Sequence, residues 1–484
     1  MQSQTEADSL EIRESLALNY TFDEIARITG GQLLQGNPCA RVSGVAVDSR
    51  KDVSGSLFCA IPGQRADGHD FVPAVASKGA VGALIHRPVE IADPAFGLVL
   101  VDSTIKALGA LASFHRSKLP ATVIGITGSV GKTSTKDLIG AVLSQRFTTY
   151  RNPGNLNSHI GLPLAVLGME AGYEYSVLEM AMRARGEIRE LCGIAKPKIG
   201  VLTDISASHI GVLGTLEEIA LAKSELIESL PADGLAVLCH DNEMVREAGK
   251  HAKCRKTTYG FSEHADCVGY DIKASDSGST DFRVSYKGRQ FSFTLRLPGI
   301  HQVQNALAAI AIGFELGLSE EEIAQGLLNV SLSPMRLEVI RKQRLTVIND
   351  AYNASVKSME AALDLLESVG KGRKVAILGD MLEMGEHGPE AHVQVGRYAR
   401  RKADVLVAIG PLSNYTKQGW DQAAATSDIS SSWFPDKESA VDFLRRFIEP
   451  GDICLVKASR GFEFEWLVDL LLNLNFTLTG DDPC

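Results

Sequence analysis

A glycine-rich segment that leads into a lysine and a run of hydroxyl residues carries the clearest chemical signal in this sequence. Residues 128–134 read G-S-V-G-K-T-S. Glycines let the backbone curl so that successive N–H groups point at an anion, and a helix that begins directly afterwards adds partial positive charge. Lys132 could then reach the terminal phosphates of a nucleotide, and the hydroxyl of Thr133 could bind Mg2+. The candidate phosphate-binding residues are Gly128, Ser129, Val130, Gly131, Lys132, Thr133 and Ser134.

The elements that flank this segment have the order that a phosphate-binding loop requires. Residues 121–127 form a short apolar, β-branched run, and residues 136–143 show apolar residues at helical spacing. The general pattern G-x-x-x-x-G-K-[ST] requires a glycine where this chain has Ile126, so the alternative is a glycine-rich turn with a chance lysine. The strand before the loop and the helix after it favour nucleotide binding.

Two polar segments outside this loop have side chains suited to binding. Ser49 and Arg50 follow a predicted strand, where they could grip a phosphate or a base; a solvated polar turn explains them equally well. Residues 152–163 read NPGNLNSHIGLP and include Asn157 and Ser158. Such side chains often only stabilise turns, but their position downstream of the phosphate-loop helix gives a ligand contact comparable weight.

Three residues of the same region could hold metal or charge. Glu179 ends an apolar strand, which is where nucleotide-hydrolysing folds place the acid that meets Mg2+; an ordinary strand-end carboxylate is the alternative. His209 lies in the loop after the next predicted strand, and Lys223 lies on an amphipathic helix predicted for residues 215–230. A lone helical lysine is normally solvated, but the apolar neighbours of Lys223 favour an inward orientation.

The last third of the chain alternates strand and helix, which favours a parallel, doubly wound sheet. Polar residues cluster where three of its strands should end. Since ligands bind at the carboxyl edge of such sheets, we expect the three clusters to face one cleft. The clusters are Asn349 with Asp350; Asp380 with Glu383 and Glu386; and Lys457 with Ser459 and Arg460.

Length and composition limit the class of protein. The chain has 484 residues, which suggests about three domains, and we expect an α/β fold throughout. The expected domains are 1–119, of which 1–18 form a loose leader, then 120–332 and 333–484. The net charge of -10 argues against nucleic-acid binding as the main activity. The eight cysteines show no metal-binding spacing and are expected to be reduced, and we expect a cytoplasmic protein with no membrane insertion.

With these residues in view, the chain resembles the Mur ligases, ATP-dependent enzymes that form the amide bonds of the peptidoglycan peptide. The resemblance extends from about residue 21 to residue 465. Four stretches carry it: DSRKDVSGSLFCAIPGQRADGHDF; TGSVGKTSTKD with NPGNLNSHIGLP; MRLEVI followed by NDAYNAS; and LGDMLEMGEHGPEAHVQVG. The resemblance implies a small α/β domain that binds the UDP end of a precursor, a central P-loop ATPase domain and a C-terminal Rossmann-like domain.

The resemblance also implies roles for individual residues. Lys132, Glu179, His209 and Lys223 would be catalytic, and Thr133, Glu179, His209 and Lys223, the last if carbamylated, would bind Mg2+. Besides the loop, Asn305, Arg336 and Asp350 would contact ATP. The substrate contacts would be Ser49, Arg50, Asn157, Ser158, Asn353, Asp380, Lys457 and Arg460. The chain departs from the usual family pattern at Gln302, Ser158 and residues 355–356.

The activity implied is ATP-dependent ligation of D-alanyl-D-alanine to UDP-N-acetylmuramoyl-tripeptide through an acyl phosphate, by an enzyme that is expected to be a monomer. The fourth stretch favours this over the sister ligase that adds the third amino acid. The Ser49 segment argues against a folyl-polyglutamate ligase, which lacks a UDP-binding domain. A P-loop ATPase that works as a switch or motor is the alternative from another class of protein.

Overall fold

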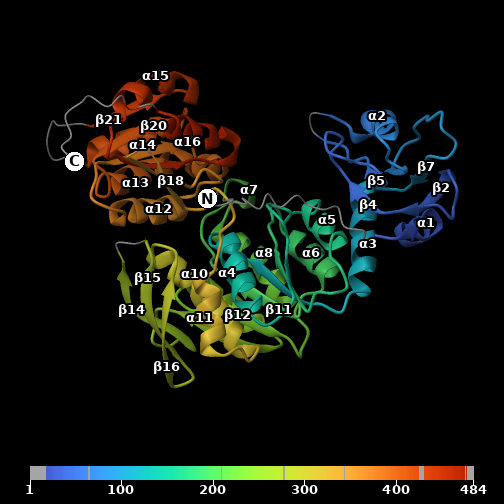
Figure 1. Cartoon of the computed structure of the whole chain (residues 1–484), viewed down its shortest axis with the longest axis horizontal. Coiled ribbons are helices and arrows are strands. Elements are labelled where there is room, and N and C mark those ends of the chain that lie inside the picture. Colours follow the sequence, from blue (N-terminus) through green and yellow to red (C-terminus); the bar gives the residue numbers. More distant parts are fainter. Residues whose placement is uncertain are drawn as a thin grey trace, which may run out of the picture. The chain divides into compact units, whose positions relative to one another are not determined.

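The computed structural model describes residues 18–63, 66–208, 210–275, 278–342, 344–423, 430–474 and 476. The chain, which Figure 1 colours along its sequence, divides into two compact units by the residues that contact one another. The first comprises residues 1–125, 147–181 and 187–198, and the second comprises residues 126–146, 182–186 and 199–484. The predicted leader lies outside the described residues, except for Leu18, which is buried.

The N-terminal part of the first unit is a small α/β domain, as predicted. Its five-stranded sheet has the order β2-β7-β6-β5-β4, in which only the β2–β7 pair is antiparallel. The predicted capping box of the first helix is present, since the side chains of Thr21 and Glu24 each accept the other's backbone N–H. The elements are β1 (Tyr20–Thr21), α1 (Phe22–Thr29), β2 (Gln32–Gln35), β3 (Arg41–Val42), β4 (Gly44–Ala46), β5 (Ser56–Cys59), η1 (Gly68–Phe71), α2 (Val72–Ser77), β6 (Gly82–Ile85), β7 (Gly97–Leu100) and α3 (Thr104–Ser117).

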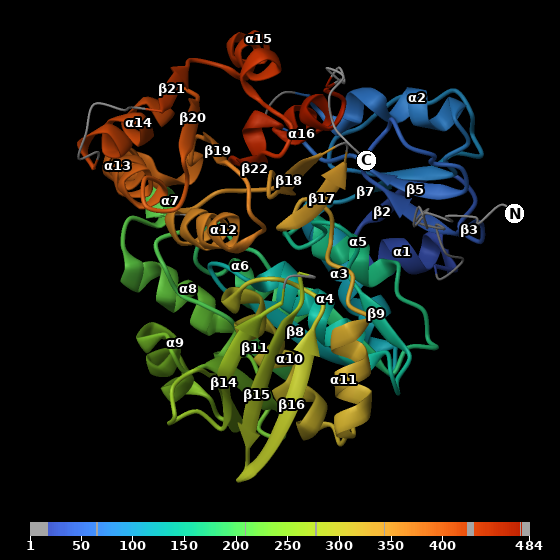
Figure 2. The same cartoon turned by 60° about the vertical axis from the view of Figure 1, so that its left-hand side comes forward.

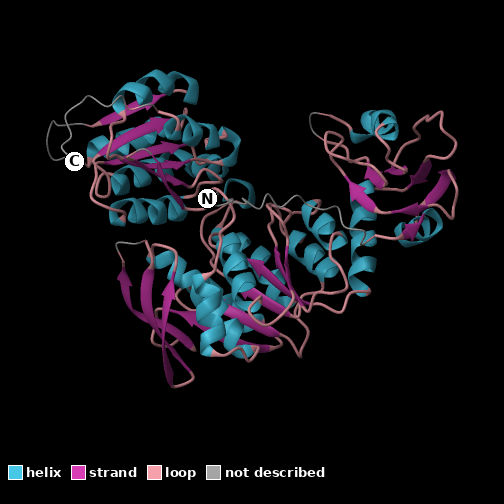
Figure 3. Cartoon of the chain, in the orientation of Figure 1, coloured by secondary structure: helices cyan, strands magenta, loops and turns pink. Residues whose placement is uncertain are grey.

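The rest of the first unit packs on α3. Helices α5 and α6 both contact α3, and strands β9 and β10 pair in parallel. In sequence, β10 lies between α5 and α6. Figure 3, in the orientation of Figure 1, colours the helices cyan and the strands magenta. The elements are β9 (Thr149–Arg151), α5 (Gly161–Leu167), β10 (Tyr175–Glu179) and α6 (Glu187–Ala195).

The second unit begins with the last residues of β8 and contains a large mixed sheet. Its strands follow the order β16-β15-β14-β13-β12-β11-β8, and β14, β15 and β16 are antiparallel neighbours (Figure 2). The predicted turn at Lys287 and Gly288 joins β15 to β16. The elements are β8 (Thr122–Thr127), α4 (Lys132–Leu143), β11 (Ile199–Leu202), α7 (Ile210–Leu213), α8 (Leu216–Glu228), β12 (Leu235–Cys239), α9 (Glu243–Ala248), η2 (Gly249–His251), β13 (Arg255–Gly260), β14 (Cys267–Ala274), β15 (Thr280–Tyr286), β16 (Arg289–Leu295), α10 (Ile300–Glu315) and α11 (Glu320–Leu328).

The C-terminal part of the second unit is the expected doubly wound sheet, with one exception. The strand order is β17-β18-β22-β19-β20-β21, and every pair is parallel except β17–β18. The sequence analysis predicted neither β17 nor β21. It also missed α14, because α14 is a polar helix with few apolar positions. The elements are β17 (Glu338–Lys342), β18 (Leu345–Asn349), α12 (Val356–Ser368), β19 (Lys374–Gly379), η3 (Leu382–His387), α13 (Gly388–Ala399), β20 (Val405–Ile409), α14 (Ser413–Gln422), β21 (Ser431–Phe434), α15 (Lys437–Phe447), β22 (Ile453–Lys457), η4 (Arg460–Phe462) and α16 (Glu465–Leu472).

Both faces of this sheet are covered by helices. Successive side chains of a strand point to opposite faces, so Ala376 and Leu378 of β19 join one apolar cluster with α12 and α13, whereas Val375 and Ile377 join another with α15 and α16. Strands buried on both faces read as continuous apolar runs, which is why the sequence revealed them. Within the part of the chain that the structure describes, no helix is long and apolar enough to cross a membrane.

Candidate active site

The predicted phosphate-binding loop lies between β8 and α4. The helix begins at Lys132, earlier than the sequence predicted, and Ser134 is buried on it. Gly128 and Gly131 adopt φ values of 155° and 84°, which side chains disfavour. A Cβ atom on Gly128 would lie 2.0 Å from Oγ1 of Thr203, so the loop requires glycine there.

The segment that follows β11 holds this loop in place. Oγ1 of Thr203 donates to the carbonyl oxygen of Val130 at 2.6 Å. The N–H of Ser129 donates to the carbonyl oxygen of Asp204 at 2.8 Å, and its hydroxyl donates to the carbonyl oxygen of Ser206 at 2.9 Å. These bonds fix the backbone of the loop.

Two lysines converge on one carbonyl group of the loop. Nζ of Lys132 lies 2.7 Å from the carbonyl oxygen of Gly128, and Nζ of Lys223 on α8 lies 3.0 Å from the same oxygen. Lys223 is 2% exposed, so the prediction that it faces inward is confirmed. Burial, and then the like charge of Lys132, hold the pKa of Lys223 well below its ordinary value, while the charges of Asp204 and Glu383 oppose this shift.

Two of the residues expected to contact ATP touch the phosphate-binding segment. Oδ1 of Asn305, on α10, accepts from the hydroxyl of Thr135 at 3.3 Å, and a Cβ atom on Gly131 would lie 2.6 Å from that oxygen. Nη2 of Arg336 donates to Oγ1 of Thr133 at 3.2 Å. The structure therefore brings these distant sequence positions to the loop.

The polar residues at the ends of β18 and β22 form a buried ion pair. Nζ of Lys457 lies 2.5 Å from Oδ2 of Asp350 and 2.7 Å from the carbonyl oxygen of Asn353. Burial lowers the pKa of Lys457 and raises that of Asp350, and each charge opposes the shift of the other. This lysine is therefore held by a counter-charge, unlike Lys223.

The third polar cluster, after β19, lies beside the other two. Because β18, β22 and β19 are parallel neighbours, their carboxyl ends share one edge, and the N–H of Ser459 donates to the carbonyl oxygen of Asp380 at 3.0 Å. The Asp380 carboxylate accepts from both the N–H and the hydroxyl of Ser413, at 2.7 Å and 2.6 Å. Arg460 pairs with Glu465 at 2.6 Å. The three clusters therefore share one edge of the sheet, whereas the cleft that they were expected to face stays a prediction. Asp380 supports the loop that precedes α14.

The predicted residues at the ends of β9 and β10 form a hydrogen-bond network in the first unit. Oε1 of Glu179 accepts from Nδ2 of Asn157 at 2.8 Å, and the N–H of Glu179 donates to Oδ1 of Asn152 at 2.9 Å. Glu179 is 2% exposed. Oγ of Ser158 accepts from the N–H of Gly161 at 3.3 Å, which supports the start of α5. Asn157 therefore orients the buried carboxylate.

Ser49 and Arg50 lie in an exposed turn of the first unit. The guanidinium of Arg50 donates to both carboxylate oxygens of Asp48 at 2.8 Å, and its side chain is 88% exposed. This pair lowers the pKa of Asp48 to about 2. The carbonyl oxygen of Ser49 accepts from Nζ of Lys78 at 2.7 Å.

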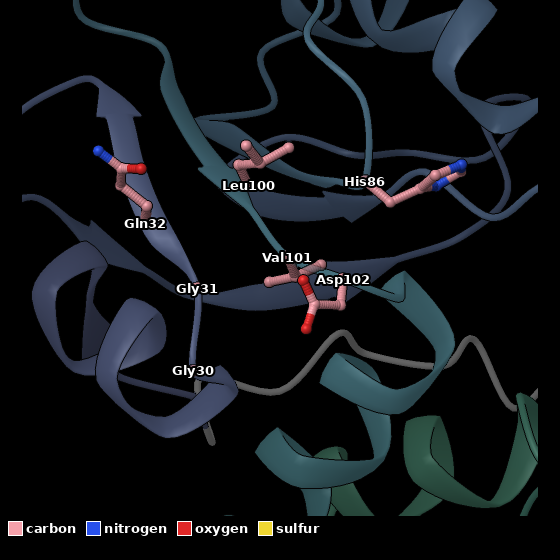
Figure 4. Close-up of a pocket in the computed structure, with 7 residues that line it drawn as sticks. All are labelled: Gly30, Gly31, Gln32, His86, Leu100, Val101 and Asp102. Carbon is pink, nitrogen blue, oxygen red and sulfur yellow. The ribbon is translucent and has the colours of Figure 1, made fainter.

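A cavity of about 470 Å3 lies elsewhere in the same domain (Figure 4). Its lining includes neither Ser49 nor Arg50. The N–H of His86 donates to Nε2 of the buried His69 at 3.0 Å, which ties the cavity wall to the domain core. The lining residues are Gly30, Gly31, Gln32, His86, Leu100, Val101 and Asp102.

One predicted metal ligand, His209, lies outside the described residues. Among the residues that are described, no group of three or more histidine, cysteine or acidic side chains forms a ready-made metal site. The seven described cysteines are free thiols, as expected.

Sequence reasoning did not single out the residues that support the loop from β11. One of these residues is Asp204, whose carbonyl oxygen accepts from the N–H of Ser129 and whose charge raises the pKa of Lys223. Its carboxylate also forms an ion pair with Lys357 of α12. β11 and β8 are neighbours in the sheet, and the N–H of Thr203, just after β11, donates to the carbonyl oxygen of Thr127, the last residue of β8, at 3.0 Å. The signal was available in part, since ligand-binding loops follow the ends of neighbouring strands.

Comparisons with known proteins agree with this architecture. Three family models match: "Mur ligase family, catalytic domain" over residues 41–116, "Mur ligase middle domain" over residues 126–313 and "Mur ligase, glutamate ligase domain" over residues 335–460. The UDP-N-acetylmuramoyl-tripeptide--D-alanyl-D-alanine ligase of Bacillus subtilis is 39% identical over 461 residues, which cover 94% of this chain and 99% of that protein.

Solved structures give the same result. MurF from Acinetobacter baumannii is similar with a TM-score of 0.85 and 30% identity, over 94% of this chain and 99% of that one. MurF ligase from Thermotoga maritima in complex with ADP is similar with a TM-score of 0.77 and 28% identity, over 89% and 97% of the two chains. The matched domains and the near full-length identity lead to one conclusion: the chain belongs to the Mur ligase family.

Proposed function

We propose that this protein joins D-alanyl-D-alanine to UDP-N-acetylmuramoyl-tripeptide at the expense of ATP, giving the UDP-linked pentapeptide, ADP and phosphate. The observation that carries the proposal is the 39% identity, over 94% of the chain, to a ligase named for these two substrates. The buried, lysine-lined phosphate loop supplies the chemistry that such a ligase needs.

The chemistry follows from the inertness of a carboxylate toward an amine at neutral pH. An oxygen of the tripeptide's terminal carboxylate attacks the γ-phosphorus of ATP, and ADP leaves. The amine of D-alanyl-D-alanine then attacks the acyl carbon, loses a proton and expels phosphate. The protein contributes positioning and charge neutralisation rather than a covalent nucleophile.

Within this reaction the phosphate loop and Lys132 hold the phosphates. Asn305, Arg336 and Asp350 contact the rest of the nucleotide. Ser49 and Arg50 contact the UDP end of the precursor. The remaining proposed substrate contacts are Asn157, Ser158, Asn353, Asp380, Lys457 and Arg460.

Mg2+ prefers oxygen ligands, which Thr133, Glu179 and a modified Lys223 would offer, whereas His209 would offer an imidazole nitrogen. Thr133 offers a hydroxyl and Glu179 a buried carboxylate. An amine is no ligand for Mg2+, but a neutral Lys223 could attack CO2, form an N–C bond and lose a proton to become an anionic carbamate. We propose that Thr133, Glu179, His209 and carbamylated Lys223 hold Mg2+, which would neutralise phosphate charge.

The wider organisation is also proposed on these grounds. The domains would be residues 1–119 for the UDP end, 120–332 for ATP and 333–484 for the incoming dipeptide, in a monomeric cytoplasmic enzyme without nucleic-acid partners.

A phosphate-release assay tests the proposed function. Release should require ATP, the UDP-tripeptide and D-alanyl-D-alanine together, and omission of either peptide substrate should abolish it. The Lys132→Ala variant should lose turnover by at least about a thousandfold while it retains binding of the UDP-tripeptide. Lys250→Ala, which removes an exposed lysine paired with Glu247, is the matched control and should be fully active. Phosphate release that ignores both peptide substrates would instead support an ATPase switch.

A further inference from the structure

The linker that precedes β17 has an unusual backbone around Arg336. Met335 and Leu337, on either side of it, adopt φ values of 60° and 54°, in the left-handed region that non-glycine residues rarely occupy. Such conformations cost free energy and persist only where the surroundings impose them. The two ends of residues 333–337 should therefore be anchored.

The first anchor is Asp137 on the phosphate-loop helix α4. Its Oδ2 atom accepts from the N–H of Ser333 at 2.7 Å and from the hydroxyl of Ser333 at 2.8 Å. Asp137 is 3% exposed, and Nζ of Lys136 lies 3.8 Å from its other carboxylate oxygen. Hydrogen bonds to a buried carboxylate are among the stronger ones in proteins, so this anchor is firm.

The second anchor is Asp350 at the end of β18. Its Oδ1 atom accepts from the N–H of Leu337 at 3.2 Å, while its Oδ2 atom pairs with Lys457. The linker is therefore held at one end by the phosphate-loop helix and at the other by the buried ion pair of the C-terminal sheet.

Arg336 lies between the two anchored residues, and its guanidinium contacts two side chains. It lies over the ring of Tyr352, 3.8 Å from the ring centroid, and it donates to Oγ1 of Thr133. Thr133 lies one helical turn before Asp137 on α4. The two side chains that contact Arg336 and Ser333 therefore lie on the same face of this helix.

We propose that Asp137 is a positioning residue for Arg336, which acts by fixing Ser333 and thereby the strained linker. In this role Asp137 would act through Ser333 rather than through a contact with substrate. The inference rests on the proposed function, because it assigns Asp137 an effect on nucleotide binding through a residue proposed to contact ATP.

A double-mutant cycle tests this proposal in the full-length enzyme. The KM for ATP should rise roughly tenfold in Arg336→Ala, which loses a charged contact, and by a similar factor in Asp137→Ala. The KM for ATP of the double variant should exceed that of Arg336→Ala by no more than about twofold, since Asp137 then has no arginine left to position. Effects that multiply to roughly a hundredfold would overturn the proposal.

Two further variants separate positioning from general damage. Asp266→Ala is the matched control, because Asp266 also accepts both the N–H and the hydroxyl of one residue, Thr258, at 2.8 Å and 2.7 Å. It should leave the KM for ATP unchanged. Ser333→Ala removes the hydrogen bond from the hydroxyl to Asp137 and keeps the one from the backbone N–H. It should raise the KM for ATP by a smaller factor and leave the KM for the UDP-tripeptide unchanged. It can replace Asp137→Ala in the double-mutant cycle if that variant does not fold.

The two levels of failure are distinguishable. If the unaltered enzyme releases no phosphate in the presence of all three substrates, the proposed function fails. If it is active but the Asp137 and Arg336 effects on the KM for ATP are independent, only the positioning role fails.

Discussion

Lys223 and Lys457 are both fully buried in the second unit, yet their surroundings differ in one decisive way. Lys457 lies 2.5 Å from a buried carboxylate of Asp350. Lys223 donates to a backbone carbonyl and feels the like charge of Lys132 more strongly than any opposite charge. Burial lowers the pKa of both lysines, but the Asp350 carboxylate opposes that shift at Lys457, whereas the like charge of Lys132 adds to it at Lys223. The amine of Lys223 is therefore the one poised to react in its neutral form.

The largest expected effect concerns stability. Lys457→Met leaves the Asp350 carboxylate buried without its cation and should lower the free energy of unfolding by about 3–5 kcal/mol. Lys223→Met removes a poorly solvated amine and should be neutral or stabilising. Urea unfolding of both variants measures the difference, and equal destabilisation would remove the contrast between the two lysines.

The charge of Lys457 also acts on His301 of α10. Burial, and to a smaller extent Lys457, lower the pKa of His301 to about 4, although Asp364 opposes the shift. Between pH 6.5 and pH 4 the unfolded chain binds this proton and the folded chain does not, so stability falls as the pH drops through that window. The loss is on the order of 3 kcal/mol.

Unfolding of His301→Gln across this pH range checks the prediction. The variant should show a flatter profile than the unaltered protein between pH 6.5 and pH 4. Identical slopes would mean that other groups cause the acid sensitivity.

A third test concerns the reactive amine of Lys223. If its neutral form takes up CO2, rigorous removal of CO2 should reduce turnover by roughly tenfold or more, and bicarbonate should restore it. Bicarbonate should do nothing for Lys223→Met. Full activity of the unaltered enzyme without CO2 would argue that the unmodified lysine suffices.

The smallest effect involves Asp204, which favours the charged form of Lys223 and pairs with the half-exposed Lys357. Lys357→Ala should cost at most about 1 kcal/mol of stability, and less at high salt, because the pair is screened. It should also raise the pKa of Lys223, since Asp204 then acts on that amine without a competing cation. Unfolding at two salt concentrations, together with the pH dependence of CO2 activation, tests both effects.

The sequence predicted the elements whose residues follow a strong local pattern. The phosphate loop, the cap at Thr21 and the apolar strands of the C-terminal sheet are examples, since glycines, caps and buried strands leave periodic signals. It also predicted the inward orientation of Lys223, because apolar neighbours surround that lysine along its helix.

What the sequence could not predict depends on contacts between distant residues. Ser333 contacts Asp137 across a separation of 196 positions, and no local pattern in the sequence relates the two residues. The left-handed backbone at Met335 and Leu337 carries no glycine or asparagine to signal it. The polar α14 lacks the apolar stripe by which helices are recognised.

The most direct test of the account follows one oxygen atom. If the tripeptide's terminal carboxylate is labelled with 18O and the enzyme turns over with ATP and D-alanyl-D-alanine, each released phosphate should carry one labelled oxygen, because the acyl–oxygen bond breaks in the second step. Unlabelled phosphate would show that water attacks ATP, and it would contradict amide ligation through an acyl phosphate.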